Sequence, residues 1–163
     1  MLTRLKTLAV LLATTLATTL AAGAQGASQQ PGAVYRQECG SCHVPYPTAF
    51  LPQASWQKLL GSLDKHFGDS ADLLPEDRSA IEKYLAGHSY EQSSVKNRYG
   101  DRFDSPGTPL RVTETRFFQA IHREIPRRLV EDNPKVKSYA RCQVCHYGAE
   151  RGSYDEDGVR IPR

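Results

Sequence analysis

The four cysteines of this chain fall into two pairs, and each pair is followed directly by a histidine. The motifs are Cys39-Gly40-Ser41-Cys42-His43 and Cys142-Gln143-Val144-Cys145-His146. Two thiols about one helical turn apart can form thioethers with the two vinyl groups on one edge of a porphyrin. The next residue then places an imidazole under the iron, which makes C-x-x-C-H the pattern typical of c-type haem attachment. We therefore predict two covalently bound haem c groups, one at each motif.

Cysteine pairs with this spacing also occur in zinc ribbons, in redox-active dithiols and in disulfides. Zinc ribbons bring their pairs together after roughly 15–20 residues, whereas Cys42 and Cys142 are 100 residues apart. A thioredoxin-like pair needs a βαβ context, and the sequence shows no β pattern. None of these alternatives explains a histidine after both pairs. Covalent haem uses all four thiols and leaves none for nucleophilic catalysis.

Each motif supplies one axial ligand, His43 or His146, and leaves the sixth position of its iron open. Many electron-carrying cytochromes c place a methionine sulfur there. The chain has one methionine, Met1, and the mature protein is predicted to lack it, as shown below. The remaining histidines, His66, His88 and His122, are therefore the candidate ligands, since imidazole is a good donor to iron.

The spacing favours His66 for the first haem and His122 for the second. His66 follows His43 by 23 residues, and His122 precedes His146 by 24. Each distal histidine therefore lies in the same part of the chain as its motif, and no long loop has to close between the two domains. A crossed arrangement, with His122 on the first haem, stays open because the cost of loop closure grows only slowly with length. Each histidine could also be a partly buried side chain bonded to a carbonyl. His88 follows Gly87 in polar surroundings and is predicted to be a solvated capping residue.

The first half of the chain predicts a helical domain around the first motif. A short helix over 33–38 leads into the motif, and three prolines over 44–52 indicate a loop. Apolar residues at helical spacing predict a helix over 54–67 with His66 in its last turn and Gly68 at its end. Pro75 then opens a helix that ends at Gly87. This order resembles a small class I cytochrome c.

The second half is less regular. Residues 89–109 are polar and rich in glycine and proline, so we predict a linker on the surface. Thr113 is predicted to cap a helix that carries Phe118 and His122 on one face, and Asn133-Pro134 to open a helix that runs into the second motif. The predicted fold is mainly all-α with long loops. It has a cytochrome c-like domain over 25–90 and a second haem domain over 91–163.

Residues 1–24 have the pattern of a secretory signal peptide. Arg4 and Lys6 precede an apolar run, and Ala22-Gly23-Ala24 is typical of a cleavage site. Removing this segment lowers the formal net charge from +3 to +1, which does not favour nucleic-acid binding. We expect a soluble protein exported to the periplasm, an oxidising compartment where bacteria attach c-type haem.

The sequence resembles the dihaem cytochromes c of proteobacteria, the DHC family, over nearly the whole mature chain. Phe117-Phe118 is a departure, because a Trp-Phe pair is expected at that place. Besides the two C-x-x-C-H motifs, the resemblance lies in these residues: Leu51-Pro52 with Trp56, His66-Phe67-Gly68, Arg111-Val112-Thr113-Glu114-Thr115, Phe118 with His122, and Val159-Arg160-Ile161-Pro162.

The resemblance implies two haems with two histidine ligands each, and a periplasmic electron-transfer role. It also implies redox partners such as a small monohaem oxygen-binding cytochrome or a membrane b-type cytochrome. The leading hypothesis is therefore a one-electron carrier with low potentials and no enzymatic activity. The alternative is a haem enzyme or gas-binding protein with one displaceable ligand. A third interpretation is a subunit bound to a larger membrane redox complex.

Overall fold

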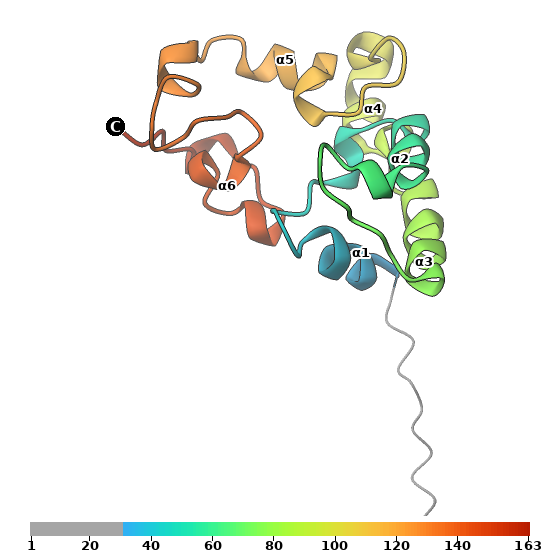
Figure 1. Cartoon of the computed structure of the whole chain (residues 1–163). Coiled ribbons are helices and arrows are strands. Elements are labelled where there is room, and N and C mark those ends of the chain that lie inside the picture. Colours follow the sequence, from blue (N-terminus) through green and yellow to red (C-terminus); the bar gives the residue numbers. More distant parts are fainter. Residues whose placement is uncertain (1–30) are drawn as a thin grey trace, which may run out of the picture.

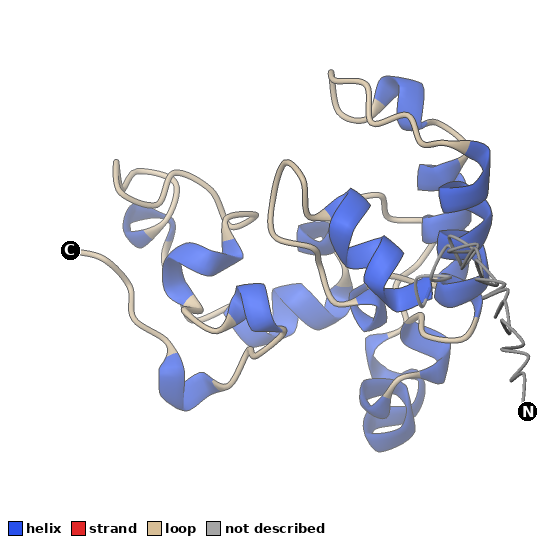
Figure 2. Cartoon of the chain, turned by 90° about the horizontal axis from the view of Figure 1, so that it is seen from below, coloured by secondary structure: helices blue, strands red, loops and turns tan. Residues whose placement is uncertain are grey.

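A computed structural model describes residues 31–163, and the predicted signal peptide over 1–24 lies outside this range. The described chain is helical and contains no strand, as predicted (Figures 1 and 2). The α-helices are α1 (Pro31–Cys39), α2 (Gln53–Leu60), α3 (Pro75–Ala86), α4 (Ser94–Tyr99), α5 (Arg116–His122) and α6 (Cys142–Cys145). The 3-10 helices are η1 (Thr48–Phe50), η2 (Leu63–Lys65), η3 (Tyr90–Gln92), η4 (Gly100–Phe103), η5 (Val112–Glu114), η6 (Arg127–Leu129), η7 (Ala149–Arg151) and η8 (Glu156–Gly158).

The core lies where α3 packs against both α1 and α2 (Figure 1). Val34 of α1, Leu59 of α2 and Ile81 of α3 are all buried in one apolar cluster. Trp56 joins this cluster and donates its indole N–H to the carbonyl oxygen of Thr48 at 2.8 Å. That bond ties α2 to the proline-rich loop after the first motif and so fixes the loop that borders the first haem-binding site.

The predicted helix over 54–67 is shorter than the apolar pattern indicated. α2 ends at Leu60, with Gly61 as its C-cap, and the chain continues through η2 to His66. His66 therefore does not lie on a helix, and the backbone turns sharply at Phe67 and Gly68, whose φ angles are 54° and 111°. Gly68 allows this turn but does not end α2. The pattern failed because Leu63 keeps its buried position in a 3-10 turn, where the spacing of apolar residues is similar.

The helix predicted to begin at Pro75 is confirmed. Pro75 opens α3, Glu76 and Asp77 lie in its first turn, and Gly87 caps its C-terminus. The polar segment over 89–109, in contrast, is not a simple surface linker. It folds into η3, α4 and η4, with Tyr90 buried and its backbone N–H bonded to the carbonyl of Leu51 at 3.0 Å.

Two helix starts in the second half differ from the prediction. Thr115, not Thr113, caps the helix that carries His122: its hydroxyl accepts from the backbone N–H of Phe118 at 3.2 Å. Asn133-Pro134 does not open a helix. Asn133 accepts from the N–H of Lys135 at 3.0 Å as an N-cap would, but the backbone leaves helical geometry at Lys137, whose φ is 72°. The helix at the second motif, α6, is only the four residues from Cys142 to Cys145.

The two halves share apolar contacts. Val112 and Phe118 belong to the same buried cluster as the residues of α1, α2 and α3. The division into domains at residue 90 stays a prediction. Within the described part of the chain, no helix has the length and apolar character needed to cross a bilayer.

Candidate functional site

The first motif begins at the C-terminal end of α1. Cys39 is the last residue of that helix, and Gly40 follows where a Cβ atom would overlap the carbonyl oxygen of Arg36. Glycine is therefore required at this position, because the chain passes close to the end of α1. Val44 is buried, and its carbonyl oxygen accepts from Nδ1 of His43 at 2.8 Å. This bond leaves Nε2 of His43 available as a donor to a metal.

The turn after α2 brings His66 opposite His43. The two imidazole centroids are 6.4 Å apart, and the ring planes differ by only 18°. The turn at Phe67 and Gly68 is closed by a bond from the backbone N–H of Ala71 to the carbonyl of Leu63 at 2.8 Å. Phe67 contacts His66 edge to face at 4.8 Å. The first pair predicted from the sequence is thus brought together.

Arg111 approaches this site from the second half of the chain. Its guanidinium lies 4.0 Å from the centre of the Phe67 ring, in a cation–π arrangement. Its backbone N–H and side chain also face the carboxylate of Glu114. Arg111 therefore covers the half-exposed Phe67 next to His66, a contact that the sequence pattern did not reveal.

The C-terminal tail holds the second motif in place. His146 and Val159 form an isolated antiparallel bridge, and the N–H of Arg160 donates to the carbonyl of Cys145 at 3.0 Å. The Asn133 amide donates to the carbonyl of Pro162 at 2.7 Å. A helix of only four residues cannot hold its own position, so these bonds position Cys145 and His146.

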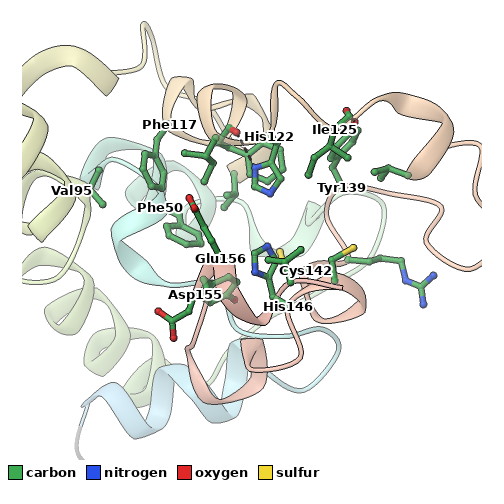
Figure 3. A pocket seen from close by; sticks show the side chains of 18 of the residues that line it. Phe50, Val95, Phe117, His122, Ile125, Tyr139, Cys142, His146, Asp155 and Glu156 are labelled. Carbon is green, nitrogen blue, oxygen red and sulfur yellow. Dashed lines mark hydrogen bonds between the residues drawn. The ribbon is translucent and has the colours of Figure 1, made fainter. Parts of the chain in front are cut away.

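α5 and α6 place the second pair of histidines on opposite sides of one cavity. Figure 3 shows His122 of α5 and His146 pointing toward each other. Their ring centroids are 6.2 Å apart and their planes cross at 71°. His122 donates from Nδ1 to the carbonyl of Phe118 at 3.0 Å, and its ring stacks on Phe118 with a centroid distance of 3.9 Å. These contacts fix the imidazole and direct Nε2 into the cavity.

The cavity has a volume of about 730 Å³ and is lined by both halves of the chain, within the size range of roughly 300–1,000 Å³ for cofactor pockets. Cys142 and Cys145 lie on its wall together with Phe50, Phe117 and Tyr139 (Figure 3).

Tyr154 also lines this cavity, a position that the sequence pattern did not indicate. Its ring centroid is 5.4 Å from that of His146, and its buried hydroxyl has no hydrogen-bond partner among the described residues. An unpaired buried hydroxyl on this wall suits a polar group of a bound molecule. The tail around Tyr154 lacks periodicity, and the sequence offers no signal for this contact.

The distances within both histidine pairs fit a metal ion between the rings. An imidazole–metal bond is about 2 Å, and the ring centre lies roughly 1.2 Å beyond the donor nitrogen, so two trans imidazoles have centroids about 6.4 Å apart. Among residues 31–163, no group of three or more histidine, cysteine or acidic side chains could hold a metal on its own. A site with two protein donors fits a metal whose other ligands come from a macrocycle, which also disfavours the zinc interpretation.

Burial lowers the pKa of three histidines in the two pairs. Burial lowers the pKa of His66, with the neighbouring His43 and Arg111 adding to the effect. Burial also lowers the pKa of His122 and of His146. These imidazoles are therefore neutral at neutral pH, with a lone pair free for a metal.

None of the four cysteines, all of which lie within residues 31–163, forms a disulfide. Burial raises the pKa of Cys39 to about 11, with Glu38 adding to the shift. Burial likewise raises the pKa of Cys142 to about 11. A catalytic cysteine needs a lowered pKa, so these two residues do not have the character of nucleophiles.

His88 lies apart from both pairs. Its ring stacks on Tyr84 with a centroid distance of 4.2 Å, and its Nδ1 is 2.7 Å from the carbonyl oxygen of Tyr84. It is exposed at the end of α3, where a histidine can interact with the last carbonyls of the helix.

Comparison with known proteins shows which family this chain resembles. The family model for dihaem cytochrome c matches residues 35–154. The structure is similar to that of a diheme cytochrome type c from Shewanella baltica OS155, with a TM-score of 0.66 and 42% sequence identity over 81% of this chain and 94% of the other. It is also similar to the diheme cytochrome c from Rhodobacter sphaeroides, with a TM-score of 0.63 and 36% identity over 75% and 95% of the two chains. No curated protein sequence matches the chain.

The matched region contains both C-x-x-C-H motifs and both histidine pairs, and its relatives share the same helical fold. Members of this family carry two covalently bound haem c groups and act as haem-based electron carriers, which agrees with the two sites described above. The chain therefore belongs to the dihaem cytochrome c family.

Proposed function

We propose that this protein is a periplasmic one-electron carrier in which each haem has two histidine ligands and a low reduction potential. His43 and His66 would hold the first haem, and His146 and His122 the second. The observation that carries the proposal is the pair of centroid distances, 6.4 and 6.2 Å, each of which fits a metal ion between two imidazoles.

The haem iron would supply the reversible exchange of one electron. The protein holds the imidazoles still through the carbonyls of Val44 and Phe118, which accept from Nδ1 of His43 and His122. Such bonds orient a metal ligand and raise its basicity. Fixed ligands on both faces limit rearrangement when the charge of the site changes, which suits an electron carrier and leaves no free position for substrate.

The low potentials follow from the donor type. Imidazole stabilises ferric iron better than a thioether does, so a site with two histidines has a lower potential than a His/Met site. The periplasmic location rests on the predicted signal peptide over 1–24 and on the oxidising character of that compartment. We infer redox partners such as a small monohaem oxygen-binding cytochrome or a membrane b-type cytochrome, from the resemblance to the family.

The test replaces each distal histidine separately in the full holo-protein. His66→Met should raise the potential of one haem, and His122→Met that of the other, each leaving the second reduction step nearly unchanged. His88→Ala is the matched control and should change neither potential nor spin state. If both methionine variants affect the same haem, or if His88→Ala produces a high-spin iron, the ligand assignment is wrong.

Carbon monoxide distinguishes the carrier from a gas-binding protein or haem enzyme. Added to the reduced wild-type protein, it should leave the optical spectrum nearly unchanged, because both axial positions are taken. A large spectral change in the wild type would show a displaceable ligand and would support the alternative function.

A further inference from the structure

Tyr46 lies in the loop that follows the first motif, against the proximal histidine of the first site. Its ring centroid is 5.1 Å from that of His43, with the planes tilted by 38°. Pro45 and Pro47 flank it and restrict the backbone on both sides. Its carbonyl oxygen accepts from the Tyr35 hydroxyl at 2.5 Å. Since Tyr35 is buried in α1, Tyr46 is firmly held within the segment of the first site.

The hydroxyl of Tyr46 contacts the segment that precedes the second motif. It donates to the carbonyl oxygen of Ala140 at 3.0 Å, across 94 positions of the sequence. Ala140 lies two residues before Cys142, the first cysteine of the second motif. This hydrogen bond joins the loop after the first motif directly to the residues that precede the second motif.

The two motifs also face each other across a smaller space. A cavity of about 420 Å³ is lined by Cys42 and His43 of the first motif and by Gln143 of the second. Figure 1 shows the loop after α1 reaching the region of α6. An apolar contact also joins the halves: the ring centroids of Phe50 and Tyr154 are 5.2 Å apart. Apolar contacts are not directional, whereas a hydrogen bond depends on both distance and angle.

We propose that Tyr46 is a positioning residue that fixes the distance and relative orientation of the two haem-binding motifs, and thereby the coupling between the two haems. The inference deepens the proposed function and needs only that both motifs carry haem. Electrostatic interaction between two charged centres falls with their separation, so the bond to Ala140 affects how strongly the oxidation state of one haem changes the potential of the other. The ring on His43 and the hydroxyl on Ala140 make one rigid connection between the sites.

The test compares Tyr46→Phe and Tyr46→Ala with the wild type as full holo-proteins. Tyr46→Phe keeps the ring on His43 and removes the bond to Ala140, and Tyr46→Ala removes both. Two readouts report the coupling: the spin–spin interaction in the electron paramagnetic resonance (EPR) spectrum of the fully oxidised protein, and the separation of the two reduction steps. Both should decrease in Tyr46→Phe and decrease further in Tyr46→Ala.

Ser89→Ala is the control. It also removes a hydrogen bond from a side-chain hydroxyl to a backbone carbonyl, from Ser89 to Leu85 at 2.7 Å, but this bond lies at the end of α3, away from both motifs. This variant should keep the wild-type spin–spin interaction. Wild-type coupling in Tyr46→Phe, or an equal loss in Ser89→Ala, would overturn the proposal. If Tyr46→Ala does not mature, Tyr46→Phe alone decides. A failed ligand assignment would show itself in the methionine variants and would leave the Tyr46 comparison unaffected.

Discussion

Thr115 controls the position of His122 through two hydrogen bonds. Its hydroxyl accepts from the N–H of Phe118 at 3.2 Å and donates to the carbonyl of Val112 at 2.8 Å. The ring of Phe118 in turn stacks on His122, and the backbone carbonyl of Phe118 accepts from Nδ1 of His122. Thr115 is 2% exposed, so water cannot replace the lost partner. We therefore predict that Thr115→Val loosens His122 without touching it.

The size of the effect follows from the cap and from burial. Loss of a threonine N-cap costs about 1 kcal/mol, and a buried N–H without a partner raises the cost toward roughly 2 kcal/mol. For a chain of this length, about 2 kcal/mol lowers the melting temperature by roughly 6–10 °C. The loss should be specific to the second site, because α5 carries His122 but not His66.

The assay combines thermal unfolding followed by circular dichroism with carbon monoxide binding to the reduced holo-protein. Thr115→Val should melt earlier and bind more carbon monoxide, at one haem only. Thr115→Ser is the matched control, since it keeps both hydrogen bonds and loses one methyl group, at a cost of about 0.8 kcal/mol. Equal melting temperatures and equal carbon monoxide binding in the valine and serine variants would refute the reasoning.

Three further predictions concern the two motifs. Gly40→Ala should lower the yield of protein with two haems, because the added Cβ would overlap the Arg36 carbonyl. Gly61→Ala is the control and should mature normally, because the nearest atom to its Cβ is 3.4 Å away. Haem content is measured by absorbance and mass, and equal yields of the two variants would contradict the prediction. Arg160→Pro removes the N–H that donates to the Cys145 carbonyl at 3.0 Å and should weaken only the second site, by about 1 kcal/mol. It should therefore bind more carbon monoxide than the control Arg160→Ala, which keeps this N–H. Equal binding in the two variants would count against the role of the tail. The oxidised protein should give two distinct low-spin EPR signals, and the signal of the second site should have the larger anisotropy. The reason is that the imidazole planes cross at 71° in the second pair and at 18° in the first, and crossed planes leave the iron d orbitals closer in energy. Identical signals from both haems would contradict this prediction.

The haem motifs could be predicted from the sequence because attachment chemistry fixes the spacing of its residues. Two thiols and a histidine must meet one porphyrin edge and one iron, so the five-residue pattern is local and repeats unchanged at both sites. Helix α3 was predicted for a similar reason: Pro75 and the acidic first turn mark its start and Gly87 its end, and each signal acts on the residues next to it. The family resemblance then indicated the helical fold and the haem content.

Errors arose where tertiary contacts outweigh local preference. His66 leaves the predicted helix because α2 ends at Leu60 and the chain turns at Phe67 and Gly68. Asn133 has the properties of a helix start, but the backbone leaves helical geometry at Lys137, and the Asn133 amide donates to the Pro162 carbonyl of the tail. The second motif has only one helical turn, and bonds from the tail hold it in place.

The sequence by itself determined which residues can attach haem and which histidines are available as ligands, since both depend on residue type and short spacing. The tertiary structure decided which histidines face each other, at 6.4 and 6.2 Å, and that one pair is nearly parallel while the other is crossed. It also brought Tyr46 to Ala140 across 94 positions. Closing a long loop costs little more than closing a shorter one, so spacing alone cannot select such partners, and the packing of the folded chain does.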